Sequence, residues 1–422
     1  MNRSDFEIMS PVGSWESLAA AFQAGAGSVY FGVDKLNMRA RSASKFTIDD
    51  LREIARLCSG HGVKSYLTLN TVMYGEDLPM MRMIADAALE AGISAVIACD
   101  VAVMTYCNSI GLEVHLSTQL NISNIEALRF YARFADVVVL ARELNLDQVA
   151  EISRRIEEED IRGPKGDPVR IEMFCHGALC MAISGKCYMS LDLLGASANR
   201  GACMQVCRRG YNAYLLRDRE SDLELSVENQ YLMSPKDLKT IRFIDRMIEA
   251  GVRVFKIEGR ARGADYVRTV TECYSEAIGA VMDGNFTEER KDEWDRRLAT
   301  VFNRGFWDGW YLGQKLGEWN DRYGSQATET KVYVGRCTDY FAKLGVGEFL
   351  PEAAPLTEGD RLMVTGNATG CLTFNLEGPR VDLKPVREVP QNTPVSFRTP
   401  EKVRRGDKLY KLVPREGQEG QS

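Results

Sequence analysis

The sequence has little of what several common enzyme classes require. It contains only three histidines among 422 residues. It has neither a Ser-His-Asp order nor an HExxH motif, and therefore lacks the recognisable machinery of a serine or zinc protease. No Walker motif is present, and Gly25 and Gly27 lie after a predicted helix and before a predicted strand, the reverse of the order in a phosphate-binding loop. These absences exclude a nucleotide-binding fold and leave a peptidase without visible catalytic groups.

The sequence also has no excess of positive charge and no long apolar run. The formal net charge is -6, which argues against a protein that coats nucleic acid non-specifically, because such binding depends on many phosphate contacts. A local basic patch that holds one RNA is still compatible with this charge. The first ten residues form no apolar signal segment, and no run approaches the ~18 apolar residues of a membrane span. We therefore expect a cytoplasmic protein without membrane contact, whose thiols stay reduced.

Short apolar runs alternate with helical patterns through most of the chain. The strand candidates are residues 7–11, 28–32, 64–70, 95–100, 113–119, 136–142, 170–176 and 252–259. Helical periodicity covers residues 14–24, 48–58, 78–91, 124–134, 146–156, 235–250 and 264–282. Eight strands alternating with helices predict an α/β fold, namely a (β/α)8 TIM-like barrel. A doubly wound open sheet is the alternative, because the number of strands does not show closure.

Helix ends are marked by glycine and proline. Gly25, Gly60 and Gly92 follow helical patterns and are expected to take positive φ at helix C-termini. Ser234 and Pro235 are expected to open the helix at 235–250.

The pattern of apolar residues changes near residue 330, where helical periodicity disappears. Short strand patterns lie between Gly, Pro, Asn and Asp at residues 331–338, 361–365, 372–375, 381–386, 394–398 and 408–412. This pattern predicts a small C-terminal all-β barrel domain. We divide the chain into a catalytic barrel at 1–315, a linker at 316–329, the β-barrel domain at 330–415 and a disordered tail at 416–422.

Five of the eleven cysteines lie between residues 172 and 208, in an insertion that follows the seventh predicted strand. Clustered cysteines in a reducing compartment bind metal or catalyse. Four of them are spaced as Cys180-x6-Cys187 and Cys203-x3-Cys207. This wide, irregular spacing favours an iron–sulfur cluster. Structural zinc, which favours C-x2-4-C pairs, is the alternative.

The residues around these cysteines fit a metal centre. Ser184 and Gly185 permit a tight turn, and residues 199–201 offer polar hydrogens to sulfur. Strand alternation places Glu172, Phe174 and His176 on one face and the fifth cysteine, Cys175, on the other, as a buried packing thiol. His176, at the end of a strand beside the metal site, is a candidate for acid–base chemistry.

Polar side chains end or follow the other apolar runs, and the C-terminal ends of parallel strands meet at one barrel mouth. We therefore expect a substrate pocket there, although each of these residues alone fits a capping or structural role. They are Asn70, Gln119, Arg142, Glu258 and Arg260.

Several long motifs resemble one known family. EMFCHGALCMAISGKC at 172–187 is similar to the signature of the U32 family of "collagenase-like peptidases". The resemblance extends over residues 10–313. It includes SPVGSWESLAAAFQAGAGSVYFG (10–32), NMRARSASKFT (37–47), VHLSTQLNISN (114–124), LARELN (140–145), YLMSPKDL (231–238) and FKIEGRARGADYV (255–267).

The resemblance implies a redox enzyme as much as a peptidase. Several members of the family are oxygen-independent hydroxylases that carry a [4Fe–4S] cluster. One branch converts the wobble uridine of tRNA to 5-hydroxyuridine with prephenate as co-substrate, another modifies an rRNA cytidine, and a third hydroxylates quinone precursors as a two-protein pair. The C-terminal β-domain favours the tRNA branch, with the anticodon loop as partner and a second U32 subunit as a further one. A collagenase-like peptidase, and an RNA-binding or assembly protein with a structural cluster, are the alternatives.

Carried onto this chain, the resemblance implies cluster ligands at Cys180, Cys187, Cys203 and Cys207. Glu172 and His176 become candidate proton-transfer groups. Four arginines, Arg39, Arg41, Arg142 and Arg260, are expected to bind the carboxylates of prephenate. Their alternative role is in salt bridges to Glu143 and Glu258. The remaining residues expected to bind substrate are Asn70, Gln119 and Glu258.

Overall fold

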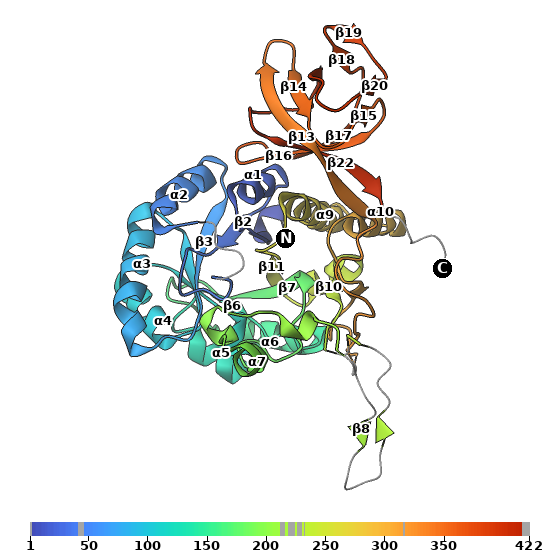
Figure 1. Ribbon diagram of the computed structural model, residues 1–422. Coiled ribbons are helices and arrows are strands. Elements are labelled where there is room, and N and C mark those ends of the chain that lie inside the picture. The colour runs from blue at the N-terminus through green and yellow to red at the C-terminus, as the bar shows by residue number, and fades with distance from the viewer. Residues whose placement is uncertain are drawn as a thin grey trace.

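Eight parallel strands of the described chain close into a barrel (Figure 1). The order around the ring is β11-β1-β2-β3-β4-β5-β6-β7, and β7 pairs with β11 to complete it. This closure confirms the (β/α)8 barrel and excludes the open sheet. The computed structural model describes residues 2–40, 46–211, 230–231, 233–314 and 317–415, with the backbone alone of 216–217 and 224–225.

The barrel strands coincide closely with the apolar runs of the sequence. They are β1 (Glu7–Pro11), β2 (Ser28–Phe31), β3 (Lys64–Leu69), β4 (Ala95–Ala98), β5 (Val114–Leu116), β6 (Val137–Val139), β7 (Arg170–Ala178) and β11 (Val252–Ile257). The helices outside them are α1 (Trp15–Gln23), α2 (Leu51–Gly60), α3 (Leu78–Ala91), α4 (Val101–Ser109), α5 (Ile125–Tyr131), α6 (Leu146–Glu158), α8 (Ile244–Glu249) and α9 (Ala264–Met282).

Helix α2 illustrates why these segments fold as they do. Its buried residues, Leu51, Ile54, Ala55 and Cys58, recur at intervals of three and four and form one apolar face against the barrel. Side chains at the N-caps fix where other helices begin: Asn124 accepts a hydrogen bond from the Ala127 N–H at the start of α5. The barrel therefore follows from local patterns that agree with one another.

Two expectations about helix ends are wrong. Residues 237–239 form a short strand, β10 (Asp237–Lys239), antiparallel to the end of β7, and α8 begins only at Ile244. Pairing with β7 overrides the local Ser234-Pro235 helix signal. Gly25 and Gly92 do take positive φ, but Gly60 is the last residue of α2 and Gly62, at φ 67°, adopts the left-handed conformation instead.

The segment between β7 and β10 carries the clustered cysteines. It contains α7 (Met189–Leu194) and a pair of antiparallel strands, β8 (Leu216–Arg217) and β9 (Glu224–Leu225). After α9, the helix α10 (Glu288–Thr300) and the strand β12 (Phe306–Trp307) complete this part of the chain.

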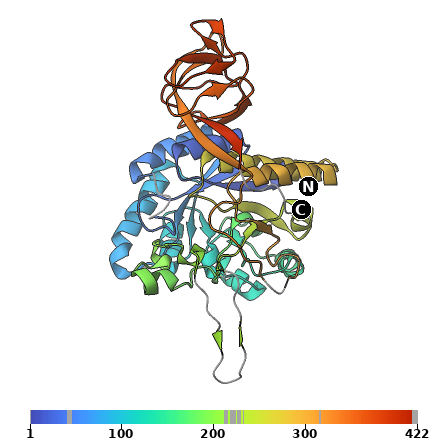
Figure 2. The same ribbon diagram turned by 45° about the vertical axis from the view of Figure 1, so that its right-hand side comes forward.

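The C-terminal region forms a separate antiparallel sheet, the β-domain (Figure 2). Its eight described strands are ordered β17-β16-β22-β13-β14-β21-β18-β19 around a core of its own that includes Val334, Phe349 and Leu409. The strands are β13 (Glu329–Phe341), β14 (Val346–Pro351), β16 (Arg361–Gly366), β17 (Gly370–Asn375), β18 (Arg380–Val381), β19 (Lys384–Pro385), β21 (Val395–Arg398) and β22 (Lys408–Pro414). A separate pair joins β15 (Leu356–Thr357) to β20 (Glu388–Val389).

Two features of this sheet differ from the sequence prediction. Residues 381–386 are a hairpin and not one strand, because Asp382 and Leu383 both take positive φ and reverse the chain. Strand β14 was not predicted, because Gly347 and Pro351 weaken its strand pattern.

The β-domain packs against α1 and α9 of the barrel, on the side away from β8 and β9 (Figures 1 and 2). A small buried cluster joins the two parts: Ala20, Ala264, Met363 and Cys371. Beside it, the Gln23 amide donates to the Thr369 carbonyl at 3.0 Å and accepts from the Cys371 N–H at 3.1 Å. No helix in the described part of the chain is both long and apolar enough to cross a bilayer.

The amide of Gln23 provides a test of this interface. Gln23→Ala leaves the Cys371 N–H and the Thr369 carbonyl without their partner, and we expect the free energy of unfolding to fall by about 1–3 kcal/mol. Urea denaturation measures the change. Arg52→Ala, at an exposed position of α2, is the control and should stay within about 0.5 kcal/mol of the wild type. If the two substitutions changed the free energy of unfolding equally, the predicted contribution of Gln23 to stability would be contradicted.

Candidate active site at the barrel mouth

A cavity of about 220 Å³ lies at the C-terminal ends of the barrel strands. Its floor is formed by residues at or just after strand ends, including Thr68, Ile97, Phe174 and Lys256. Residues 178–208, which follow β7, form the opposite wall. This is the end of the barrel at which ligands are bound in enzymes of this architecture.

Four cysteines of the insertion line the cavity: Cys180, Cys187, Cys203 and Cys207. Burial raises the pKa of the Cys207 thiol, Arg208 opposes this effect, and the charges of the other three thiols raise the pKa further. Cys207 is therefore within electrostatic range of the other three thiols. Among the described residues, no three Cys, His, Asp or Glu side chains are arranged to hold a single metal ion.

The fifth cysteine lies elsewhere. Cys175 is fully buried in the core between the barrel and its helices, and its thiol contacts the Lys256 carbonyl at 3.4 Å. This confirms the prediction of a packing thiol.

Glycines let the insertion approach the barrel closely. Gly185, at φ 74°, would place a Cβ 2.8 Å from the Cγ of Gln119, and Gly201, at φ 85°, would place one 2.3 Å from the carbonyl oxygen of Asn37. Neither position accommodates a larger residue without movement of its neighbour. Gly185 thus supports the predicted tight turn, and Gly201 sets the position of Cys203 two residues later.

The residues before Cys203 behave differently from one another. Asn199 lines the cavity, and its Oδ1 is buried without a hydrogen-bond partner among the described residues. The Arg200 guanidinium is bound to Asp77 and to the Val72 carbonyl, and it lies 4.0 Å from the centroid of the Tyr74 ring. Asn199 therefore belongs to the cavity wall, whereas the hydrogens of Arg200 hold the insertion to the loop after β3.

Three of the four predicted arginines line the cavity, and Arg41 lies outside the described residues. Arg39 forms an ion pair with Glu258 at 2.9 Å. Arg142 donates to the Ser184 hydroxyl at 2.8 Å, and Arg260 donates to the Thr68 hydroxyl at 2.6 Å and to Asn37 Oδ1 at 3.2 Å. The salt-bridge alternative thus describes Arg39, whereas Arg142 and Arg260 are held by neutral groups.

Burial controls the charges here. Burial lowers the pKa of the Arg260 guanidinium to about 10, far above neutrality, so it keeps its charge. Burial also raises the pKa of the Glu258 carboxyl, but the charge and hydrogen bond of Arg39 and the charges of Arg260 and Arg142 together leave the pKa below its usual value. The ion pair of Arg39 and Glu258 is therefore charged on both sides at neutral pH.

Asn70 and Gln119 join the cavity floor through one hydrogen-bond network. The Asn70 amide donates to the Ser117 hydroxyl at 3.1 Å, and that hydroxyl donates to the Gln119 amide oxygen. Asn70 also accepts from the Met38 N–H at 3.2 Å. The structure thus brings both predicted residues to the cavity, where each is already oriented by a neighbour.

Four further cationic side chains line the cavity that the sequence prediction missed: Lys256, Arg208, Arg262 and Arg304. Arg208 adjoins Cys207, and Arg262 lies in the same motif as Arg260, FKIEGRARGADYV at 255–267, so both had a signal in the sequence. Arg304 follows α10, far from any motif, and had none. Glu258 is the one carboxylate among the described lining residues, so the cavity is strongly positive.

Neither Glu172 nor His176 lines this cavity. Glu172 is fully buried beneath it and accepts a hydrogen bond from Lys256 Nζ at 2.6 Å. Because Lys256 does line the cavity, Glu172 reaches it only through that lysine. The other oxygen of Glu172 has no hydrogen-bond partner among the described residues.

The expectation that His176 shares a face with Glu172 and Phe174 is wrong. Lys256 pairs with Phe174 and Ile257 pairs with His176, so β7 carries one extra residue at Cys175. Such a bulge interrupts the alternation of side chains. His176 therefore packs among the rings of Tyr266, Tyr274 and Phe306.

The environment of His176 predicts a pH dependence of stability. Burial, aided by the charges of Lys239 and Arg262, lowers its pKa to about 3. An unfolded histidine titrates near 6.5, so between these values the unfolded chain binds a proton that the folded chain does not, and stability falls as the pH drops below about 6.5. We expect His176→Phe to lose less free energy of unfolding than the wild type between about pH 7 and about pH 5.

Urea denaturation at both pH values measures this difference. His61→Phe is the matched control, because His61 is exposed on the surface, and it should follow the wild type. A His176→Phe variant with the same acid sensitivity as the wild type would contradict the prediction.

Comparison with known proteins confirms the family that the motifs indicate. The model of "Peptidase family U32" matches residues 13–321. A "Collagenase" of Porphyromonas gingivalis is 62% identical over 99% of this chain and 100% of its own length. The "tRNA hydroxylation protein P1" of Bacillus subtilis is 32% identical over 79% of this chain and 77% of its own. The "23S rRNA 5-hydroxycytidine C2501 synthase" of Escherichia coli is 34% identical over 68% of this chain and 40% of its own. This chain belongs to the peptidase family U32.

Proposed function

We propose that this protein is an oxygen-independent RNA hydroxylase that forms 5-hydroxyuridine at the wobble position of tRNA, with prephenate as co-substrate. The observation that carries the proposal is the cavity itself, which four cysteines and a set of buried guanidinium groups line together. Relatives named for tRNA hydroxylation and for rRNA hydroxycytidine synthesis supply the reaction class.

The four cysteines would hold a [4Fe–4S] cluster. Each thiol of such a cluster binds a different iron, so the ligands stand around a larger group than a single ion. Four thiols around one cavity, with the charge of Arg208 beside Cys207, fit that requirement. A bound cluster supplies one-electron redox chemistry at the cavity wall.

The arginines would bind the two carboxylates of prephenate. Arg142 and Arg260 are held in place by neutral oxygens and keep donor hydrogens for a bidentate carboxylate. A carboxylate near Arg39 would instead compete with Glu258. Arg142 and Arg260 are therefore the principal contacts of the co-substrate in this proposal, and Asn70 and Gln119 would contact its hydroxyl or the base.

A nucleobase must leave its stack to enter so small a cavity, and single-stranded loop bases do so at least cost. Phe174 offers a ring on the cavity floor, with the Arg142 guanidinium 5.2 Å from its centroid. Lys256, oriented by Glu172, is the polar group placed to donate a proton from the floor. Glu172 in this scheme is a positioning residue.

The metal assignment predicts a specific composition. Protein purified without oxygen should contain iron and acid-labile sulfide, and replacing any of Cys180, Cys187, Cys203 or Cys207 by alanine should remove most of both, because a cubane with three thiolates is held less firmly. Cys175→Ala is the matched control and should retain them. Zinc without sulfide in the wild-type protein would refute the cluster.

The reaction predicts a nucleoside. Deleting the gene from the source organism should remove 5-hydroxyuridine and its alkylated derivatives from tRNA, as measured by mass spectrometry of digested nucleosides. The wild-type gene should restore them and a Cys203→Ala gene should not. Persistence of these nucleosides in the deletion would overturn the tRNA assignment and direct attention to rRNA and quinones.

A peptidase is the second candidate, because a relative that is similar over 99% of this chain is named "Collagenase". The three histidines do not favour it: His61 is exposed, His115 is buried beside Glu113, and His176 is enclosed by aromatic rings. Degradation of gelatin by the purified protein, lost on replacing a cavity residue such as Arg260, would favour the peptidase over the hydroxylase.

A further inference from the structure

A second cavity, of about 670 Å³, lies between the barrel and the β-domain. Its walls are the loop after β11, the first turns of α9, the end of α10 and the facing strands β13, β16, β17 and β22. Ala261 and Arg262 line both this interdomain groove and the cavity at the barrel mouth. A polymer lying in the groove would therefore run directly to the candidate active site.

Arg262 stands at that junction in an unusual environment. Its guanidinium carbon lies 3.5 Å from the centroid of the Phe302 ring, and the guanidinium carbon of Arg304 lies 5.1 Å from the same centroid. Arg304 has a carboxylate nearby, with Asp237 at 3.5 Å. No hydrogen bond or ion pair joins the Arg262 guanidinium to another described residue. The positive charges of Arg262 and Arg304 thus lie beside the same Phe302 ring, and the N–H donors of the Arg262 guanidinium are unused among the described residues.

The other cations of the groove among the described residues already have partners: Arg297 pairs with Glu276 at 2.6 Å, and Arg415 donates to the Ser325 carbonyl. Arg268 pairs with Glu272 at 2.7 Å, Lys331 pairs with Asp265 at 2.9 Å, and Arg361 pairs with Glu329. Burial lowers the pKa of Arg262, Asp237 opposes this and Arg304 adds to it, which is the expected state of a guanidinium that lacks a close anion. Arg262 therefore differs from its neighbours in having its donors available for a ligand.

We propose that Arg262, assisted by Arg304, binds a phosphodiester of the RNA strand where the strand passes from the interdomain groove into the active-site cavity. The planar guanidinium matches two phosphate oxygens, and its stacking on Phe302 fixes its orientation in advance. A position shared by two cavities suits a strand that continues through both, whereas a small dicarboxylate needs only the inner one. This inference rests on the proposed RNA hydroxylase function.

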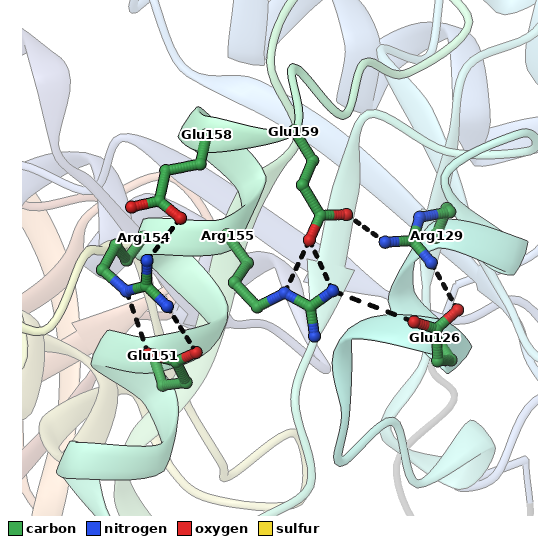
Figure 3. A network of polar contacts seen from close by, with 7 residues as sticks. All are labelled: Glu126, Arg129, Glu151, Arg154, Arg155, Glu158 and Glu159. Atoms are coloured by element: carbon green, nitrogen blue, oxygen red, sulfur yellow. Dashed lines mark hydrogen bonds and ion pairs between the residues drawn. The ribbon is translucent and has the colours of Figure 1, made fainter.

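The test compares RNA affinity among four proteins: the wild type, Arg262→Gln, Arg262→Lys and the control Arg154→Gln. Arg154 lies in an exposed ion-pair network on α6, where it contacts Glu151 and Glu158 (Figure 3). Its loss changes the net charge equally without touching either cavity. The probe is an RNA hairpin whose unpaired loop contains uridine, and binding is measured by fluorescence anisotropy over a range of salt concentrations.

We expect Arg262→Gln to weaken binding by about tenfold at low salt. It should also reduce the slope of log K against log salt by about 0.7, the value for one phosphate of a single strand. Arg262→Lys should restore part of the affinity, and Arg154→Gln should resemble the wild type. An Arg262→Gln variant whose affinity and slope equal those of Arg154→Gln would overturn the inference.

Modified RNA makes the test independent of any folding defect. A hairpin with one neutral methylphosphonate in the loop should bind the wild-type protein as weakly as the normal hairpin binds Arg262→Gln, and the two changes together should cost no more than one. If Arg262→Gln binds every hairpin normally but loses affinity for prephenate, the anion is the dicarboxylate and the phosphate assignment fails. A wild-type protein that binds no hairpin would refute the proposed function as well.

Discussion

The pairing of β7 with β11 is the interaction on which most of the site depends. It closes the barrel, and it places Glu172 beside Lys256, a buried ion pair whose lysine forms part of the cavity floor. The insertion that carries the cysteines follows the C-terminal end of β7, and Glu258 and Arg260 follow the C-terminal end of β11 beside it. A buried ion pair of this kind is costly to break, because either partner alone would be an uncompensated charge. The pairing of β7 with β11 therefore closes the barrel and also fixes the positions of the thiols and arginines relative to one another.

The sequence predicted the barrel well because its strands are short runs rich in apolar residues, as expected when helices cover the outside of a parallel sheet. It failed where pairing partners decide the outcome. Residues 237–239 have a helical pattern, yet they meet the free edge of β7 beyond the barrel and extend it. Asp382 and Leu383 lie within an apparent strand, yet they form a turn in which both residues take positive φ. A leucine at this position does not predict such a turn. The hydrophobic pattern and the residue propensities of a segment therefore predict neither its long-range strand pairing nor the exact backbone conformation of its turns.

The candidate site shows the same division. The predicted cysteine ligands and the predicted carboxylate-binding arginines are recognisable in the sequence. Those that the structure describes all line one cavity: the four cysteines, Arg39, Arg142 and Arg260. The face of His176 was not predictable, because a single extra residue at Cys175 changes the direction of every side chain that follows it on the strand. Arg304 was not predictable either, because only the return of the chain after α10 brings it to the cavity and to Asp237.

The net charge of -6 conceals a cavity of the opposite sign. Six arginines and Lys256 face it, with Glu258 as the one carboxylate among its described lining residues. Because Arg260 and Arg208 are buried, their charges are poorly screened by water and act over the short range of the cavity. An acidic exterior repels phosphate chains in general, whereas this interior attracts an anion that enters it. Under the proposed function, only an RNA that inserts a loop nucleotide gains the attraction, so the distribution of charge selects for the shape of the substrate before any base is recognised.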